Sequence, residues 1–223
     1  DQFKPLADKI ESAMQSIVDK PLKYIVNTHF HGDHTGSNSY FSHHAPIFAH
    51  HNVRKRLSSK SDHDHAALPV VTYENGITIH LSDETIELSH YPSGHTDGDT
   101  VVYFKKANVL HMGDLFFQGR FPFIDLNNGG SVKGYLANAK SILSTFPSTT
   151  KIIPGHGNLT DMNGLKDLIA MLEFSINRVE KAIANKLSLE QVIKQGIGEK
   201  YKSLDWNFIT EEKWLTTLYT DLK

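Results

Sequence analysis

One pattern recurs along this chain and constrains its fold more than any other: short apolar runs that end in side chains able to bind a metal. In the first case, the apolar and β-branched residues 24–28 predict a buried strand. The next six residues hold three histidines and one aspartate, namely His29, His31, Asp33 and His34. Residues 35–38 (Thr-Gly-Ser-Asn) are typical of a turn that begins a helix. These side chains therefore lie where a strand ends, which is a common place for functional residues in α/β folds.

The residue types in this segment suit a divalent metal such as zinc, because neutral imidazole nitrogens and carboxylates are among its preferred ligands. In an extended loop His29 and His31 point the same way, whereas Asp33 and His34 can reach a second point nearby. The spacing therefore favours two metal ions over one. The alternative is a polar surface loop that is rich in histidine by chance.

Three further segments each place a candidate ligand close behind an apolar run of the strand type: His95 behind residues 85–89, Asp114 behind residues 108–112 and His156 behind residues 151–153. A glycine adjoins each of these ligands, so the backbone can crowd the site where a Cβ would clash. Four such segments in order along the chain argue against a chance collection of histidines.

The chain resembles the metallo-β-lactamase-fold hydrolases in four motifs, which are residues 28–34 (Thr-His-Phe-His-Gly-Asp-His), 94–96 (Gly-His-Thr), 113–114 (Gly-Asp) and 154–157 (Pro-Gly-His-Gly). The resemblance spans residues 1 to about 160. It implies an α/β fold, a four-layer αβ/βα sandwich with a binuclear metal site along one edge. Members normally begin with several strands that end in an aspartate, and this chain begins near that point, so we expect it to lack the first strands.

The resemblance also implies a ligand set. By the family pattern, the first metal is held by His29, His31 and His95. The second metal is held by Asp33, His34 and His156. The carboxylate of Asp114 bridges both ions.

Two positions indicate the branch of the family. The lactamases proper usually carry Cys or Ser at the position of Asp114, and those with Cys tend to place a Lys three residues later, where this chain has Phe117. Thioesterase, lactonase and RNA-processing members carry Asp. Members that reduce oxygen or nitric oxide at iron have Glu in place of His31. We therefore expect hydrolysis of an activated acyl bond, with an ester, thioester or lactone favoured over a lactam.

The cofactors and the reaction follow from the same resemblance. We expect two Zn²⁺ ions, with iron or manganese as alternatives, and attack by a metal-bridging hydroxide, because bound Zn²⁺ lowers the pKa of its water to about 7. Asp33 is expected to orient this nucleophile as well as bind the second metal. Asn128 lies about as far beyond Asp114 as the family's occasional oxyanion-stabilising asparagine, and we expect it to serve in catalysis there.

Composition limits the partners. The net charge of −2 gives no basic surface for a nucleic acid, and a small-molecule substrate is expected. No apolar run of about 18 residues is present, so we expect no membrane span. The absence of cysteine is compatible with export and favours a periplasmic or secreted location over a cytoplasmic one. The oligomeric state stays open.

Length and periodicity predict a single metallo-β-lactamase-fold domain over residues 1–223. Apolar residues recur at helical spacing in residues 6–18, which predicts an amphipathic helix that covers the sheet. The same spacing predicts that residues 160–223 are mostly helical. The polar stretch 58–68 is either a mobile flap or a plain solvated loop.

Other function classes remain open. A β-lactam hydrolase would use the same metals, and a phosphodiesterase acting on RNA should show a basic surface. A hydrolase of glutathione thioesters should carry basic substrate-binding residues on C-terminal helices, and no such motif is evident. A non-catalytic metal-binding module would not need the bridging Asp114.

Several side chains outside the motifs have two interpretations. The histidine pairs 43–44 and 50–51 and the stretch 62–65 (Asp-His-Asp-His) are expected to be surface residues and not a third metal site. His80, His90 and His111 fall within strand patterns and are expected to be hydrogen-bonded structural residues. Arg120 either neutralises a substrate anion or is structural. The phenylalanines 116, 117, 121 and 123 either line an apolar pocket or pack in the core.

Overall fold

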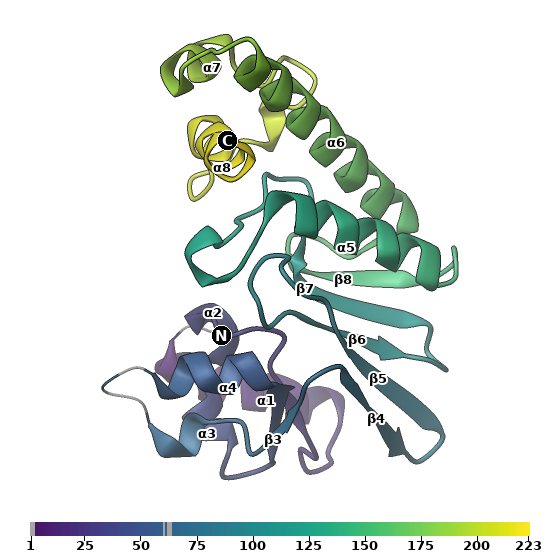
Figure 1. Cartoon of the computed structure of the whole chain (residues 1–223). Coiled ribbons are helices and arrows are strands. Elements are labelled where there is room, and N and C mark those ends of the chain that lie inside the picture. The colour runs from purple at the N-terminus through teal and green to yellow at the C-terminus, as the bar shows by residue number, and fades with distance from the viewer. Residues whose placement is uncertain (1–2, 60, 62–63) are drawn as a thin grey trace.

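The computed structural model describes residues 3–59, 61 and 64–223, and in this part of the chain two β-sheets are stacked between layers of helices (Figure 1). The first sheet is parallel and has the order β1 (Ile25–Val26), β2 (Ile47–His50), β3 (Val71–Tyr73). The second sheet runs in chain order through β4 (Gly76–Leu81), β5 (Glu84–His90), β6 (Thr100–Phe104), β7 (Val109–Phe117), β8 (Lys151–His156) and β9 (Thr160–Asp161). Neighbouring strands of this sheet are antiparallel, except that β7 and β8 are parallel.

The described helices fall before, between and after these strands. In chain order they are α1 (Ala7–Ile17), α2 (Gly32–Thr35), α3 (Asn38–Phe41), α4 (His51–Ser58), α5 (Val132–Thr145), α6 (Met162–Ala184), α7 (Leu189–Gln195) and α8 (Glu211–Leu222). Short 3₁₀ turns cover Lys4–Leu6, His65–Ala67, Leu126–Asn128 and Lys202–Leu204. Of the stretch 58–68, in which a flap was considered, residues 60, 62 and 63 lie outside the described part of the chain.

The side chains of a strand point alternately to its two faces, and this explains how the layers stack. In β6, Val101 and Tyr103 belong to the apolar cluster of α5 and α6, whereas Val102 shares a cluster with Phe48 of the first sheet. Next to Phe48 in β2, Ala49 packs in a cluster with Val53 of α4. Because successive side chains of a strand point to opposite faces, each sheet buries one face against the other sheet and one against helices. The four-layer αβ/βα sandwich implied by the resemblance is therefore confirmed.

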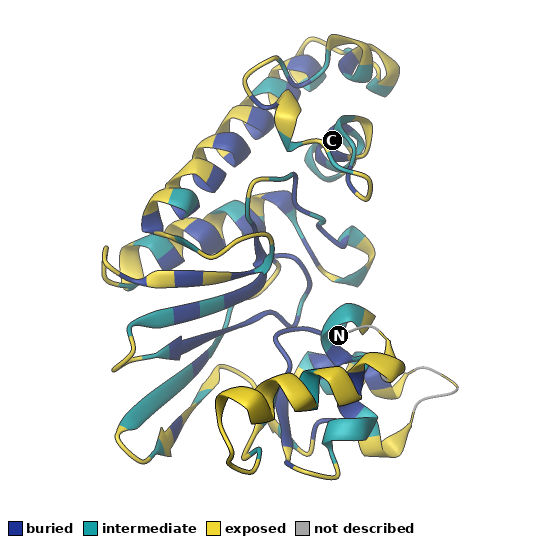
Figure 2. Cartoon of the chain, turned by 180° about the vertical axis from the view of Figure 1, so that it is seen from behind, coloured by how far each residue is buried: buried dark blue, intermediate teal, exposed yellow. Residues whose placement is uncertain are grey.

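Beyond β9 the described chain is helical. The long helix α6 buries one side, including Leu165, Leu172 and Val179, and leaves the other exposed (Figure 2). It packs against α5 and α8, and α7 packs against α8. Across residues 3–59, 61 and 64–223, no helix combines the length and the apolar character that a membrane crossing requires.

Helix α1 forms where the periodicity predicts it, but it does not cover the sheet as expected. Ala7 is its one buried residue, while the side chains of Met14 and Ile17 are 37% and 81% exposed. Its apolar side lines a cavity of about 810 Å³ together with Val26 and Ile79 from the two sheets. Periodicity indicates which side of a helix is apolar, but not what lies opposite that side.

Candidate metal centre

The seven candidate ligands are positioned by strand ends, as the sequence predicts. His29 and His31 follow β1, and Asp33 and His34 lie on the short helix α2. The other three come from the second sheet: His95 from the β5–β6 loop, Asp114 from β7 and His156 from the last position of β8. The structure brings all seven together in two groups that share Asp114.

The first group consists of His29, His31, His95 and Asp114, and its candidate ligand atoms lie within 4.8 Å of one another. His95 Nε2 is 2.9 Å from His31 Nδ1 and 3.5 Å from Asp114 Oδ2. His29 Nε2 is 3.8 Å from Asp114 Oδ2. The second oxygen of Asp114 faces the other group.

The second group consists of Asp33, His34, Asp114 and His156, again with ligand atoms within 4.8 Å. His34 Nε2 lies 3.0 Å from Asp114 Oδ1, and His156 Nε2 lies 3.4 Å from Asp114 Oδ2. Asp33 Oδ2 is 3.2 Å from His156 Nε2 and 3.4 Å from His34 Nε2. A carboxylate common to both groups is what a bridge between two ions requires.

At this centre the buried atom His29 Nε2 has no hydrogen-bond partner within the described chain, and Asp114 Oδ1 has only the imidazole of His34, 3.0 Å away in an ion pair. Their side chains are 1% and 4% exposed. Since an unsatisfied buried polar atom costs free energy, the folded chain favours a cation at this point. The residues present therefore fit a metal-binding centre.

Hydrogen bonds fix which imidazole nitrogens face the centre. His95 Nδ1 lies 2.7 Å from the carbonyl oxygen of Phe123, which can accept its proton and leaves Nε2 as the ligand atom. His31 Nε2 lies 3.0 Å from Asp125 Oδ2, which leaves Nδ1 as its ligand atom. Such outer contacts are typical of metal-binding histidines, because they orient the ring and raise its basicity.

The protonation states of His29, His95, Asp33 and Asp114 suit metal ligands. Burial lowers the pKa of His29, and it lowers the pKa of His95 to about 4, so both rings stay neutral at pH 7. Burial raises the pKa of Asp114, but its contacts with His156 and His34 outweigh this effect and hold the pKa well below its ordinary value. The hydrogen bonds of His156 and His34 lower the pKa of Asp33. Both carboxylates are therefore ionised.

In the metal-free chain, hydrogen bonds to Asp114 and Asp33 raise the pKa of His156 to about 9. Burial lowers the pKa of His34, but hydrogen bonds to the same two carboxylates outweigh this effect and raise the pKa to about 9. A bound metal would therefore displace a proton from each of these two rings.

Two glycines allow the strands to approach at this point. Gly113 has φ +53°, and a Cβ there would lie 2.7 Å from the side chain of Thr28. A Cβ on Gly155 would collide with Asp114 Oδ1. A larger residue at either position would displace the ligand-bearing backbone.

A polar network that sequence reasoning missed extends outward from His31. Asp125 Oδ2 accepts a hydrogen bond of 2.7 Å from Asn128 Nδ2, and Asn128 Oδ1 accepts one of 2.5 Å from Arg56 Nη1. Arg56 also forms a bidentate pair with Asp97, at 2.7 Å from both Nε and Nη2. Both polar atoms of the Asn128 amide are thus engaged within the protein, and its expected role in catalysis stays a prediction. Asp125 stands near Asn128 in the sequence, whereas no local motif marks Arg56.

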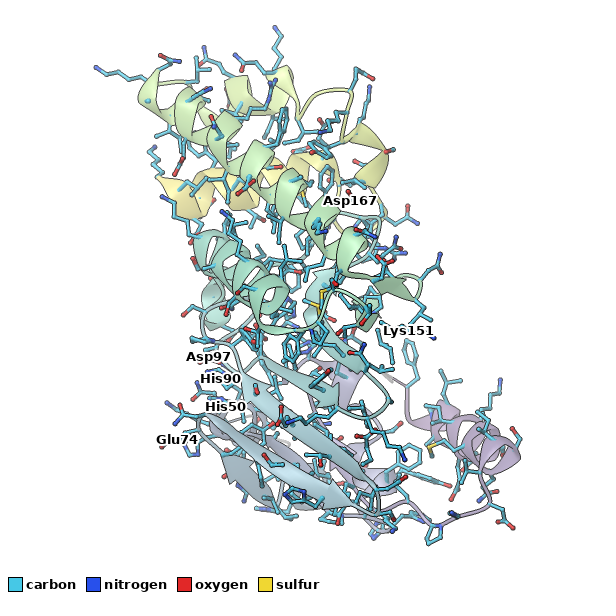
Figure 3. The ribbon with its side chains drawn as sticks, turned by 90° about the vertical axis from the view of Figure 1, so that its right-hand side faces the viewer. His50, Glu74, His90, Asp97, Lys151 and Asp167 are labelled. Atoms are coloured by element: carbon cyan, nitrogen blue, oxygen red, sulfur yellow. The ribbon has the colours of Figure 1, made fainter. Side chains whose placement is uncertain are left out.

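A second pair of histidines lies outside this centre. The rings of His50 and His90 are stacked with centroids 3.7 Å apart and an interplanar angle of 10°, near Asp97 (Figure 3). His50 is buried, so the expectation that it is a surface residue was wrong: it ends β2, and its Nδ1 accepts a hydrogen bond from Asn52 N at the start of α4. Burial, and next His90, lower the pKa of His50 to about 4. His90 is a structural residue, as expected, with Nδ1 2.9 Å from the carbonyl oxygen of Asp99.

Comparison with known proteins agrees with this arrangement. A family model described as "Metallo-beta-lactamase superfamily" matches residues 12–159, which include all seven candidate ligands. The chain belongs to the metallo-beta-lactamase superfamily. At the level of the superfamily it is a metallo-hydrolase, and its His and Asp groups are able to bind metal.

Curated relatives in the superfamily include hydrolases. The chain is 29% identical over 148 residues to the probable metallo-hydrolase YqgX of Bacillus subtilis, which covers 62% of this chain and 70% of that protein. It is 31% identical to a hydroxyacylglutathione hydrolase of Nitrosococcus oceani over 136 aligned residues. These residues make up 59% of this chain and 47% of that protein. The chain thus spans about half the length of the latter relative.

Solved structures of superfamily members share the fold. The metallo-beta-lactamase from Pontibacter korlensis matches with a TM-score of 0.66 at 19% sequence identity, over 76% of this chain and 78% of that chain. The DIM-1 metallo-beta-lactamase matches with a TM-score of 0.65 at 21% identity, over 77% of this chain and 78% of that chain. At such identities the likeness establishes the fold.

Proposed function

We propose that this superfamily member is a binuclear zinc hydrolase of an activated acyl bond, with a thioester, ester or lactone preferred over a β-lactam. The observation that carries the proposal is the pair of ligand groups that share Asp114. One ion would be held by His29, His31 and His95, and the other by Asp33, His34 and His156. When bound, the two ions would supply a hydroxide at neutral pH and polarise the carbonyl under attack.

The protein side chains have distinct tasks in this proposal. Asp33 is ionised and only partly buried, with 38% of its side chain exposed, so it can accept a hydrogen bond from the attacking water and orient it. Asp125 and the carbonyl oxygen of Phe123 orient the rings of His31 and His95. No serine or cysteine nucleophile is needed, and the chain contains no cysteine.

Two features support the acyl preference. The bridging position carries Asp114, and Phe117 stands where lactamases with Cys at that position tend to have Lys; its ring is buried and stacked on His156 with centroids 5.0 Å apart. Hydroxyacylglutathione hydrolases of Nitrosococcus oceani and of two Prochlorococcus marinus strains are among the relatives. These relatives make a thioester the first substrate class to test.

The test is a comparison of the zinc-reconstituted protein with its metal-free form against S-acyl thioesters, lactones, β-lactams and phosphodiesters. We expect about two zinc ions per chain by elemental analysis and zinc-dependent hydrolysis of a thioester or lactone. A zinc content near zero would exclude the metal centre. Turnover confined to β-lactams or to phosphodiesters would retain the centre and refute the acyl preference.

A further inference from the structure

Aromatic side chains form an arc that joins the two ligand groups. The ring of Phe123 stacks on His31 with centroids 5.6 Å apart, and the ring of Phe208 lies 5.4 Å from Phe123. Trp206 follows at 5.6 Å from Phe208, and its ring lies 6.3 Å from that of His156. The arc therefore runs from a ligand of the first group to a ligand of the second. Trp206 and Phe208 lie outside residues 12–159, the part that the family model matches.

The segment between the 3₁₀ turn Lys202–Leu204 and α8 is fastened to the sheet side of the site. Trp206 Nε1 donates a hydrogen bond of 2.9 Å to the carbonyl oxygen of Phe121, and Phe121 N donates one of 2.9 Å to Leu204 O. The guanidinium carbon of Arg120 lies 4.9 Å from the centroid of the Trp206 ring, a cation–π distance. Lys213 Nζ donates to the carbonyl oxygen of Phe208. The aromatic rings are thus held in place before any substrate arrives.

The exposure of these rings distinguishes a binding surface from ordinary core packing. Phe117, at the base of the arc, is 2% exposed. Trp206 and Phe123 are half-buried, and Phe208 is 51% exposed, although its ring contacts those of Phe123 and Trp206. A large apolar ring held in water contributes little to folding, whereas it gains free energy when a ligand covers it.

We propose that Phe123, Trp206 and Phe208 form the wall that binds the apolar part of the substrate's acyl group, and that the enzyme prefers acyl compounds with a hydrophobic body over short ones. The expected kinetic preference rests on the proposed acyl hydrolysis, whereas binding at this wall can be measured without turnover. The wall stands beside both ligand groups, so an acyl carbon at the metal centre places its substituent against these rings. Covering one aromatic ring is worth about a tenfold gain in affinity.

The experiment compares Phe208→Ala and Trp206→Ala with the unaltered enzyme, all zinc-loaded, on two thioesters of the same thiol, one acetyl and one phenylacetyl. The control is Phe174→Ala, since Phe174 on α6 is another partly exposed ring, 39% exposed and paired with the ring of Tyr201. We expect the ratio of kcat/KM for phenylacetyl to that for acetyl to fall about tenfold in both wall variants, mainly through KM, and to stay unchanged in the control. An unchanged ratio in Phe208→Ala would overturn the proposal, even if Trp206→Ala fails to fold.

Binding of phenylacetate by titration calorimetry gives a readout that needs no turnover. We expect its Kd to rise about tenfold in Phe208→Ala and to stay constant in Phe174→Ala. If no thioester is hydrolysed, the proposed function fails, while this difference in Kd still supports the wall. If thioesters are hydrolysed but Kd and the kinetic ratio are equal in all variants, the wall is refuted and the proposed function stands.

Discussion

The carboxylate of Asp114 reaches both ligand groups because the backbone around it departs from regular strand geometry. Gly113 adopts a positive φ, and the β7–β8 pairing shifts register between Gly113 and Phe117. A bulge of this kind can re-aim a side chain. The side chain is almost fully buried, and its negative charge is balanced by the imidazoles of His34 and His156 with little water nearby.

The first prediction concerns Asp114→Ala. The change leaves one group with three histidines, a set sufficient for a catalytic zinc, and the other with Asp33, His34 and His156. We expect the variant to hold closer to one zinc than two by elemental analysis, and to lose more than about a hundredfold in hydrolytic rate, since outer contacts alone cost 10–100-fold.

The matched control is His111→Ala, three residues away on β7. His111 Nδ1 accepts a hydrogen bond from Gly113 N, and it belongs to neither ligand group. Its metal content should stay at that of the unaltered protein. If Asp114→Ala keeps two tightly bound ions while His111→Ala loses one, the assignment of ligands on β7 is wrong.

The second prediction concerns pH and His50. Its pKa in the folded protein is about 4, below the ordinary value of 6.5, so the unfolded chain binds the proton more readily. Its contribution to stability is present above pH 6.5 and is lost as the pH falls toward 4; with solvent screening it amounts to about 1–2 kcal/mol. His50→Asn removes the titration and keeps a good N-cap residue. The free energy of unfolding in urea, measured for both metal-free proteins, should fall less in the variant than in the unaltered protein between pH 7 and pH 5. An equal fall in both would exclude His50 as the source of the pH dependence.

At the level of residues, the clustering of the candidate ligands was predictable, whereas the residues that support them were not; their assignment as metal ligands stays a prediction. His29, His31, Asp33 and His34 stand within six residues, and glycine marks the neighbourhood of the others, so a local motif reveals each. Arg56 and Asp125 act only through contacts between distant segments. The expectation for His50 failed for the same reason, because its burial depends on stacking against His90 from another strand.

At the level of elements, α4 is tied to the second half of the molecule through one side chain. Arg56 reaches from α4 to Asp97 in the β5–β6 loop and to Asn128 beyond β7. Its guanidinium also lies 5.3 Å from the centroid of the Phe30 ring. The helix that covers the first sheet therefore supports the network that orients His31.

The third prediction is that Arg56→Ala weakens both stability and metal binding. A bidentate pair at this partial exposure contributes about 1 kcal/mol, so we expect a melting temperature lower by about 2–4 °C. Zinc affinity, measured by competition with a chromophoric chelator, should fall by up to about tenfold. Arg54→Ala is the control, because Arg54 on the same helix donates to Pro69 O and does not contact this network. Equal zinc affinity in both variants would show that the network does not reach the centre.

Most strands and helices were predictable from local sequence patterns. The strand runs before His29, Asp114 and His156 were predicted because apolar, β-branched runs fit a buried sheet. The helices α6, α7 and α8 lie within residues 160–223, which periodicity predicts to be mostly helical. The surroundings of α1 could not be predicted, since a hydrophobic stripe carries no information about its partner.

At the level of the whole molecule, the metal centre joins the two halves of the sandwich. Candidate ligands come from behind β1 on one side and from β5–β6, β7 and β8 on the other. The fourth prediction is that removal of the metal destabilises the entire fold. A ligand at one hundred times its Kd stabilises the folded state by about 2.7 kcal/mol, so a chelator should lower the melting temperature by several degrees. An identical melting curve for protein verified as metal-free would show that the scaffold is rigid without its ions.

At this scale the sandwich and its edge site were implied by the resemblance to the metallo-β-lactamase-fold hydrolases, which rests on motifs in a fixed order at strand ends. The aromatic arc was not, because Trp206 and Phe208 meet Phe123 only through the return of the chain after α7. The phenylalanines near Asp114 left two interpretations open, and the structure supports both: Phe121 is core, while Phe123 borders the site.

The distribution of the ligands along the chain has a consequence for folding kinetics. Four ligands are local, but Asp114 and His156 arrive only when β7 and β8 pair in parallel, which requires the crossover through α5. Val109 and Lys151, which pair across β7 and β8, lie further apart along the chain than paired residues of the first sheet such as Ile25 and Ile47. More distant pairings form more slowly, so we expect the complete centre to close after the first sheet. The local quartet is already present in the unfolded chain, where zinc can bind it. Excess zinc during refolding would then stabilise the unfolded state as well, and reduce the net gain from the metal.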